Sequence, residues 1–166
     1  MAIVDIGSNT VRLVVYDTPQ RLPIPVFNEK ALCELGRNLT STGLLNPDGV
    51  LMAYQSLTRF IRLCDAMGVD RLELVATSAV RDAKDGADFV AEIERRFGHI
   101  VQVLSGPDEA KLAAMGLLCG VPHADGLAGD LGGGSFDLVA LNKGDFGEQA
   151  TLPVGHLRLA EMARDG

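Results

Sequence analysis

Residues 2–17, AIVDIGSNTVRLVVYD, place apolar residues on both sides of a Gly-Ser-Asn turn and predict a β-hairpin. Residues 126–147, GLAGDLGGGSFDLVALNKGDFG, predict a second hairpin with glycines at its turn. A shift of 125 residues superposes the two segments, so that Asp5 matches Asp130 and Gly7 matches Gly132. Because strand, aspartate, glycine turn and strand follow in the same order twice, we interpret the second hairpin as a duplicate of the first.

Strand and helix patterns alternate between the two hairpins, which indicates parallel βαβ units added to an antiparallel hairpin. The sequence therefore predicts the α/β class with a mixed sheet. Asn46-Pro47-Asp48 is typical of a helix start, with a capping side chain and a proline in the first turn. The expected elements are an edge strand near 24–27, a helix from 47 to before Gly68 with the apolar stripe Val50, Tyr54, Leu57, Ile61 and Cys64, a strand over 72–77, a helix over 87–97, a strand over 100–104 and a helix from 105 to about 119.

The pattern changes after Pro122, where the second hairpin begins. We expect residues 1–122 to form one domain and residues 123–166 to form the opening part of a second. The last segment, 151–166, starts a further strand or helix that cannot complete the second domain, so its remainder is expected outside this chain.

The balance of charges argues against a nucleic-acid polymer as partner. The 166 residues include 15 Lys and Arg against 22 Asp and Glu, a net charge of −7, with six Phe, two Tyr and no Trp to stack on bases. An anionic small substrate would have to be held locally, by backbone N–H groups, a few arginines or a metal. The three cysteines lie far apart without a CxxC motif, which is typical of thiols in a reducing compartment.

A cytoplasmic location is expected from the apolar segments. The longest uncharged stretch, 112–124, has 13 residues with two glycines and a proline, short of the roughly 20 apolar residues that a membrane span needs. The first residues have no basic region, and Asp5 lies where a signal peptide would be apolar. We therefore predict neither membrane insertion nor export.

Each predicted hairpin carries an aspartate at the end of its first strand, followed by a glycine-containing loop, namely 7–9 or 132–135. Such a loop lets backbone N–H groups approach phosphate oxygens, and the carboxylate can hold a hydrated Mg²⁺ between itself and the phosphates. Either loop alone could be an ordinary hairpin turn without a ligand. That alternative is weaker for two loops that both follow an aspartate.

Two further segments follow predicted parallel strands, where ligand-binding loops of open α/β sheets lie. In ATSAVRDA (76–83), Thr77 and Ser78 could donate hydroxyl groups and Arg81 a bidentate fork to phosphate, although a helix cap followed by a solvated arginine is the alternative. In SGPDEA (105–110), the helix dipole stabilises Glu109 and would keep it ionised, as a general base for water requires, although most acids at helix starts have only this structural role. His99, His123 and His156 have no nucleophile partner and are interpreted as surface or strand-end residues.

Taken together, five segments resemble the exopolyphosphatase/guanosine pentaphosphate phosphohydrolase (Ppx/GppA) family, a branch of the superfamily of sugar kinases, actin and the heat-shock chaperone ATPases. They are DIGSNTVRL (5–13), ATSAVRDA (76–83), SGPDEAKLAAMG (105–116), DLGGGSFDL (130–138) and PVGHLRLAE (153–161). The resemblance implies an RNase-H-like mixed sheet with helices on both faces, the start of a second similar domain, and an active site in the cleft between them. It also implies removal of the terminal phosphate of inorganic polyphosphate, or of the 5′ γ-phosphate of guanosine pentaphosphate, with Mg²⁺. The full-length protein is expected to be able to dimerise through later domains.

The resemblance also implies a role for individual residues of the five segments. Glu109 matches the glutamate that activates water. Three departures from the family pattern concern Asp137, where the family usually has Glu, Phe136, which replaces a small or hydroxylated residue, and Asp108, which replaces a common Glu. The implied phosphate-binding residues are Gly7, Ser8, Asn9, Thr77, Ser78, Arg81, Gly132, Gly133, Gly134 and Ser135, and the implied metal ligands are Asp5, Asp130 and Asp137.

Two alternatives to a phosphoanhydride hydrolase stay open. One is a non-catalytic phosphate- or nucleotide-binding module of the same fold. The other is an actin-like ATPase or sugar kinase, against which the SGPDEA segment with Glu109 argues, because such kinases do not generally carry it. Polyphosphate and guanosine pentaphosphate are not distinguished by this stretch of sequence.

Overall fold

The first hairpin forms as predicted and opens a five-stranded sheet. The computed structural model describes residues 1–17 and 23–165. β1 (Ala2–Ile6) and β2 (Thr10–Tyr16) pair antiparallel, and β3 (Pro25–Leu32) adds a longer edge strand than the expected 24–27. β4 (Leu72–Ala76) pairs parallel with β1 and β5 (Val101–Val103) pairs parallel with β4, giving the order β3-β2-β1-β4-β5. This mixed sheet confirms the predicted α/β class.

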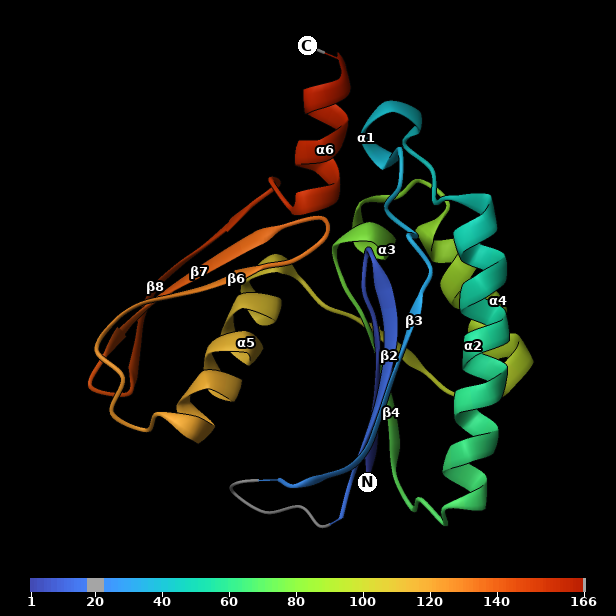
Figure 1. Ribbon diagram of the computed structural model, residues 1–166, viewed down its shortest axis with the longest axis horizontal. Helices are drawn as coiled ribbons and strands as arrows, with labels where there is room; N and C mark the ends of the chain where they lie inside the picture. Colours follow the sequence, from blue (N-terminus) through green and yellow to red (C-terminus); the bar gives the residue numbers. More distant parts are fainter. Residues whose placement is uncertain (18–22, 166) are drawn as a thin grey trace.

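Helices α2 (Pro47–Ala66) and α4 (Gly86–Phe97) cover one side of this sheet, as Figure 1 shows. The predicted stripe of α2 was wrong in part, because Phe60 is fully buried in place of Ile61. Gly49 lies on the same buried side of α2, where a Cβ would lie 3.2 Å from the backbone nitrogen of Leu35, so the helix approaches the chain closely there. Two short helices complete the first lobe, which we define as β1–β5 with α1 (Leu39–Thr42), α2, α3 (Ser78–Asp82) and α4.

The capping role expected for Asn46 is not found. Its side chain makes no cap hydrogen bond to α2, and its Nδ2 atom instead donates to the carbonyl oxygen of Glu34 at 3.2 Å. The helix start therefore depends on Pro47 at the first helical position and on Asp48 in the first turn, both of which favour an N-terminus.

The second hairpin also forms, and its register is that of the first. β6 (Gly126–Leu131) and β7 (Phe136–Asn142) pair so that Asp130 faces Asp137, as Asp5 faces Arg12 125 residues earlier. Each turn is closed by an equivalent hydrogen bond. In the first, Gly7 N donates to Thr10 O at 3.0 Å, and in the second, Gly132 N donates to Ser135 O at 2.9 Å. β8 (Asp145–Leu152) extends the meander into a three-stranded sheet, in the order β6-β7-β8.

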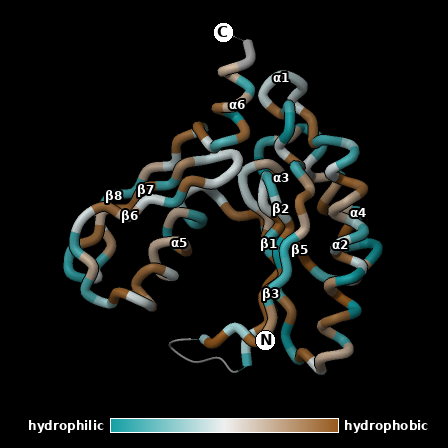
Figure 2. The backbone as a smooth tube through the Cα atoms, in the orientation of Figure 1, coloured by the Kyte–Doolittle hydropathy of each residue, from teal (hydrophilic) through white to brown (hydrophobic). Residues whose placement is uncertain are grey.

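Helix α5 (Gly106–Gly120) packs against the second sheet. Ala110 and Ala114 on α5 share a small core with Val139 and Leu141 of β7, and Figure 2 shows this apolar helix beside the sheet. The second lobe, as we use the term, therefore contains α5, β6–β8 and α6 (His156–Asp165). The domain limits 1–122 and 123–166 stay a prediction. They place α5 in the first domain, whereas α5 packs against the sheet of the second lobe.

None of the helices in the described ranges, 1–17 and 23–165, combines the length and the apolar character that a bilayer crossing requires.

Candidate active site

The two glycine loops, which follow β1 and β6, touch one another. A Cβ built on Gly133 would lie 3.0 Å from the Cβ of Ser8 and 3.2 Å from the backbone nitrogen of Asn9. Only a residue without a side chain permits this approach without displacing the opposite loop. The loops that the sequence predicts as two phosphate-binding elements are therefore brought together at the boundary between the lobes.

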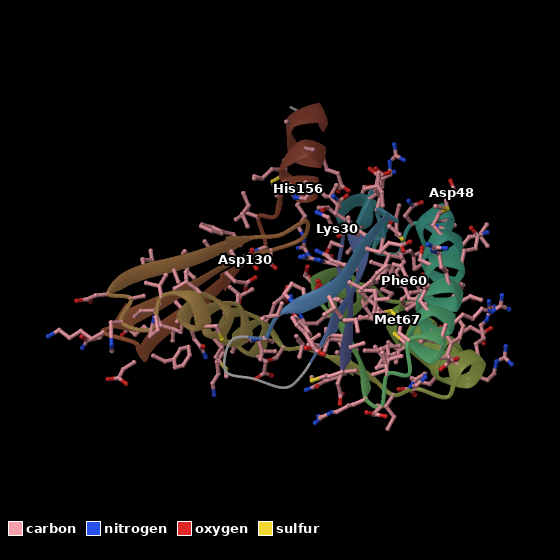
Figure 3. The ribbon with its side chains drawn as sticks, turned by 60° about the horizontal axis from the view of Figure 1, so that its bottom comes forward. Lys30, Asp48, Phe60, Met67, Asp130 and His156 are labelled. Carbon is pink, nitrogen blue, oxygen red and sulfur yellow. The ribbon has the colours of Figure 1, made fainter. Side chains whose placement is uncertain are left out.

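A cavity of about 330 Å³ opens beside this contact and receives side chains from both lobes. Arg81, Gly134, Ser135 and Asp137 from the predicted site do not line it. Lys30 and His156 do, although sequence reasoning had not singled out Lys30 and had interpreted His156 as a surface or strand-end residue. Figure 3 shows Lys30 and Asp130 on the two sides of the gap between the lobes. The predicted residues that line the cavity are Asp5, Gly7, Ser8, Asn9, Thr77, Ser78, Glu109, Asp130, Gly132 and Gly133.

Glu109 reaches the cavity from the first turn of α5, which follows β5 directly. Ser105 caps this helix by accepting a hydrogen bond from the backbone nitrogen of Asp108 at 3.2 Å. Burial raises the pKa of Glu109, whereas a hydrogen bond from Arg81 lowers it. We had expected the helix start alone to keep Glu109 ionised; its burial opposes ionisation, and Arg81 is the group that supports it.

Arg81 is not the solvated arginine that one interpretation predicted. Its Nη1 atom donates to Oε2 of Glu109 at 2.9 Å and to the carbonyl oxygen of Leu104 at 3.0 Å, and its Nε atom donates to Oδ1 of Asp82 at 3.2 Å. Only 23% of its side chain is exposed. The guanidinium therefore lies behind Glu109, outside the lining of the cavity, where it acts on the carboxylate directly.

Ser78, one of the two predicted hydroxyl donors, bonds to Ser8 of the first glycine loop. Ser8 Oγ and Ser78 Oγ lie 2.9 Å apart, and the backbone nitrogen of Ala79 donates to Ser8 Oγ at 3.1 Å. Both serines are buried. These contacts fasten the first glycine loop to the start of α3.

One carboxylate lies near the end of the first strand of each hairpin, and Asp137 lies on β7 opposite Asp130. Burial raises the pKa of Asp5 to about 6, Arg12 opposes this rise, and Asp130 adds to it. Asp137 is 4% exposed, and it accepts a hydrogen bond from Ser135 Oγ at 3.0 Å through Oδ2 only. Its Oδ1 atom is buried without a partner among the described residues. Like charges directly opposite on neighbouring strands destabilise a sheet, so the pair Asp130–Asp137 calls for a nearby positive charge.

The chemistry of these acids fits a divalent cation of the magnesium type. Within residues 1–17 and 23–165, no three His, Cys, Asp or Glu side chains gather closely enough to form a complete metal cage. Mg²⁺ does not need one, because it keeps several waters and is usually bound by one or two carboxylates together with substrate phosphates. Asp5 and Asp130 at the cavity, with the unpartnered Oδ1 of Asp137 behind them, match that donor set.

Residues 14–166 match the model of the Ppx/GppA phosphatase family. The chain belongs to this family. It is 30% identical to exopolyphosphatase 1 of Mycobacterium tuberculosis over 162 residues, which cover 96% of this chain and 47% of that protein. The resemblance predicted from the five sequence segments is therefore confirmed.

Solved structures of the Ppx/GppA family have the same fold as this chain. An exopolyphosphatase from Cytophaga hutchinsonii superposes with a TM-score of 0.89 at 28% identity, over 97% of this chain and 52% of that one. The Aquifex aeolicus Ppx/GppA family member gives a TM-score of 0.81 at 29% identity, over 96% and 53%. The chain thus spans about half the length of the Ppx/GppA proteins that it matches.

Proposed function

We propose that this chain carries the catalytic cleft of a hydrolase that releases terminal orthophosphate from inorganic polyphosphate. The observation that supports this proposal most directly is that both glycine loops and Glu109 line one cavity. Guanosine pentaphosphate, through its 5′ γ-phosphate, is the second substrate to test. The names of the relatives support polyphosphate first, since the compared proteins from Mycobacterium tuberculosis and Cytophaga hutchinsonii are both named as exopolyphosphatases.

In this proposal the terminal phosphoryl group binds between the two glycine loops. Backbone N–H groups of Ser8, Asn9 and Gly133 face its oxygens, because the glycine loops allow a ligand to approach the main chain. Lys30, at the rim of the same cavity, adds a positive charge that offsets the acids around it. Preorganised donors of this kind stabilise the charge that develops on the phosphoryl oxygens during transfer.

Glu109 accepts the proton of the attacking water in this proposal. A general base works best when its pKa lies near the working pH, and burial moves the pKa of Glu109 upward in that direction. Arg81 keeps the carboxylate ionised and oriented through the 2.9 Å hydrogen bond. The pair therefore combines a strengthened base with a fixed direction of its acceptor oxygen.

Mg²⁺ is the proposed cofactor, and Asp5, Asp130 and Asp137 are the residues that would hold it. When bound, it would neutralise negative charge on the substrate phosphates. Without Mg²⁺, the carboxylates of the cavity would repel an anionic substrate.

The experiment is to measure orthophosphate release from polyphosphate and from guanosine pentaphosphate, with Mg²⁺ and with a chelator, in the parent chain and in Glu109→Gln. Glu73→Gln is a matched control, because Glu73 lies on β4 in an exposed pair with Arg71. The proposal expects Mg²⁺-dependent release that Glu109→Gln abolishes and Glu73→Gln leaves unchanged. Polyphosphate binding without release would favour the alternative of a non-catalytic phosphate-binding module.

A further inference from the structure

An arginine of the second lobe reaches into the first lobe beside the candidate active site. Arg158, in the first turn of α6, donates a hydrogen bond from Nη2 to Oδ2 of Asp82 at the end of α3. The side chains of Arg158 and Asp82 are 16% and 36% exposed. The pair is partly open to water and contributes modestly to stability by itself, so its importance lies in joining side chains of the two lobes.

Asp82 connects this contact to Glu109. Its second oxygen, Oδ1, accepts from Nε of Arg81 at 3.2 Å, and Nη1 of Arg81 donates to Glu109 at 2.9 Å. Arg81 alone would face two carboxylates with one positive charge. Glu109 on α5 and Arg158 on α6 both belong to the second lobe, so Arg81–Glu109 and Arg158–Asp82 are both contacts between the lobes. When the lobes are in contact, Arg158 supplies the second positive charge beside the two carboxylates that Arg81 meets.

The base of α6 is attached to the second glycine loop. The backbone nitrogens of His156 and Leu157 donate to the carbonyl oxygens of Gly132 and Gly133 at 3.0 and 2.9 Å. Gly155 packs directly on the backbone of Gly133, where a Cβ has no room. A displacement of the second glycine loop relative to the first lobe is therefore transmitted to Arg158.

A second polar contact lies on the same face of α6. Glu161, three residues after Arg158, accepts a hydrogen bond from the backbone nitrogen of Thr40 at 3.2 Å, and Figure 1 shows α6 beside α1. Arg158 Nε and Glu161 Oε1 are buried without partners among the described residues. Each such atom lowers the stability of the closed contact, which suits an interface that opens and closes.

We propose that Asp82 and Arg158 form a clasp between the lobes that, when closed, positions Arg81 against Glu109. Both are positioning residues, and their effect on turnover rests on the proposed function. Phosphate bound between the two glycine loops contacts both lobes and so favours the closed clasp over the open one. The clasp thus links closure of the cleft to the orientation of the candidate base.

The clasp is tested first by a distance measurement that does not depend on turnover. Nitroxide labels are placed at Leu51→Cys on α2 and Leu127→Cys on β6, both of which are exposed, with Cys119→Ser in the background. Cys33 and Cys64 are buried and stay in place. Pulsed electron paramagnetic resonance then reports the distribution of distances between the lobes, with and without polyphosphate.

The clasp predicts longer and broader distances in Asp82→Asn and in Arg158→Gln, and a double variant that is no broader than either single variant, because both remove one interaction. Arg158→Lys, which keeps the charge, should recover part of the parent distribution. Arg59→Gln is the control, since it breaks the exposed pair with Glu29 away from the cleft. Parent-like distances in both single variants, or widths that add in the double variant, would overturn the clasp.

Turnover provides the second test. In each single variant kcat/KM for polyphosphate should fall by about tenfold, the equivalent of about 1.4 kcal/mol, with partial recovery in Arg158→Lys. Altered distances with unchanged kcat/KM would overturn the positioning role. An absence of phosphate release from the parent chain as well would instead overturn the proposed function, because the distance measurement tests the clasp separately.

Discussion

Nη1 of Arg81 donates a hydrogen bond to Oε2 of Glu109 over 2.9 Å, so that the arginine predicted to contact phosphate also holds the candidate base. Burial raises the pKa of Glu109, and this hydrogen bond is the largest influence that lowers it, whereas the charges of Asp137 and Asp5 raise it further. The protonation of Glu109 is thus set by a balance that one substitution can change.

Replacing Arg81 by Gln should raise the pKa of Glu109, because the hydrogen bond to its charged form weakens while its burial persists. The base is active as the carboxylate, so the acidic limb of the profile of kcat/KM against pH should move to higher pH. We also expect kcat to fall by about 10–10², because a hydrogen bond to a charged group contributes about 1.5–3 kcal/mol and here fixes the acceptor oxygen of the base. Arg95→Gln, in an exposed pair with Glu92, is the control. An acidic limb at the same pH as in the parent would mean that Arg81 does not influence the pKa of the base.

Stability should depend on pH through Asp5. Its pKa rises from 3.8 to about 6 in the folded chain, so folding favours the protonated form. The contribution of Asp5 is therefore most favourable below about pH 4 and is lost as the pH rises through about 6, by up to about 3 kcal/mol. Urea denaturation in a chelating buffer should show this loss in the parent and a smaller one in Asp5→Asn. Equal losses in both proteins would mean that other groups cause the pH dependence.

Binding of Mg²⁺ should depend on Asp130. In Asp130→Asn the Mg²⁺ concentration that gives half-maximal phosphate release should rise at least tenfold, because a carboxylate of the cavity becomes neutral. Asp145→Asn, on the exposed β8, should leave that concentration unchanged. If both variants kept the parent's Mg²⁺ requirement, the metal would have to be held without Asp130.

The hairpins and their loops could be predicted because both depend on local pattern. Apolar residues that alternate or follow one another define β1, β2 and β7, and the pattern Asp, apolar residue, Gly marks the end of the first strand of each hairpin. The match at a shift of 125 residues even carries over into the register, where Asp5–Arg12 corresponds to Asp130–Asp137. Such features are set by residues that are neighbours along the chain.

Contacts between distant segments could not be predicted in this way. Phe60 and Ile61 are adjacent and both apolar, so the local pattern does not decide which one is buried; the side of α2 that packs inward carries Gly49 and Phe60. The pairing of Arg158 with Asp82 joins residues of different lobes, and nothing in either local motif specifies it. His156 was missed for the same reason, since its position depends on where the second glycine loop directs α6.

The contact between the two glycine loops leads to a last prediction. A methyl group at Gly133 would press on the Cβ of Ser8 at 3.0 Å and on the backbone nitrogen of Asn9 at 3.2 Å, and neither can yield as a flexible side chain would. Gly133→Ala should therefore push the loops apart, lower the free energy of unfolding by about 1–3 kcal/mol and reduce phosphate release.

Gly116→Ala is the matched control for Gly133→Ala, because Gly116 lies within α5 with open space around its Cβ position. Alanine there should raise the free energy of unfolding by about 0.5–1 kcal/mol, as expected for a helix interior, and should leave phosphate release unchanged. Chemical denaturation and phosphate release measured on both variants test whether the contact between the glycine loops requires a glycine at 133. A Gly133→Ala protein with the stability and activity of the parent would mean that the loops lie further apart in solution than these distances require.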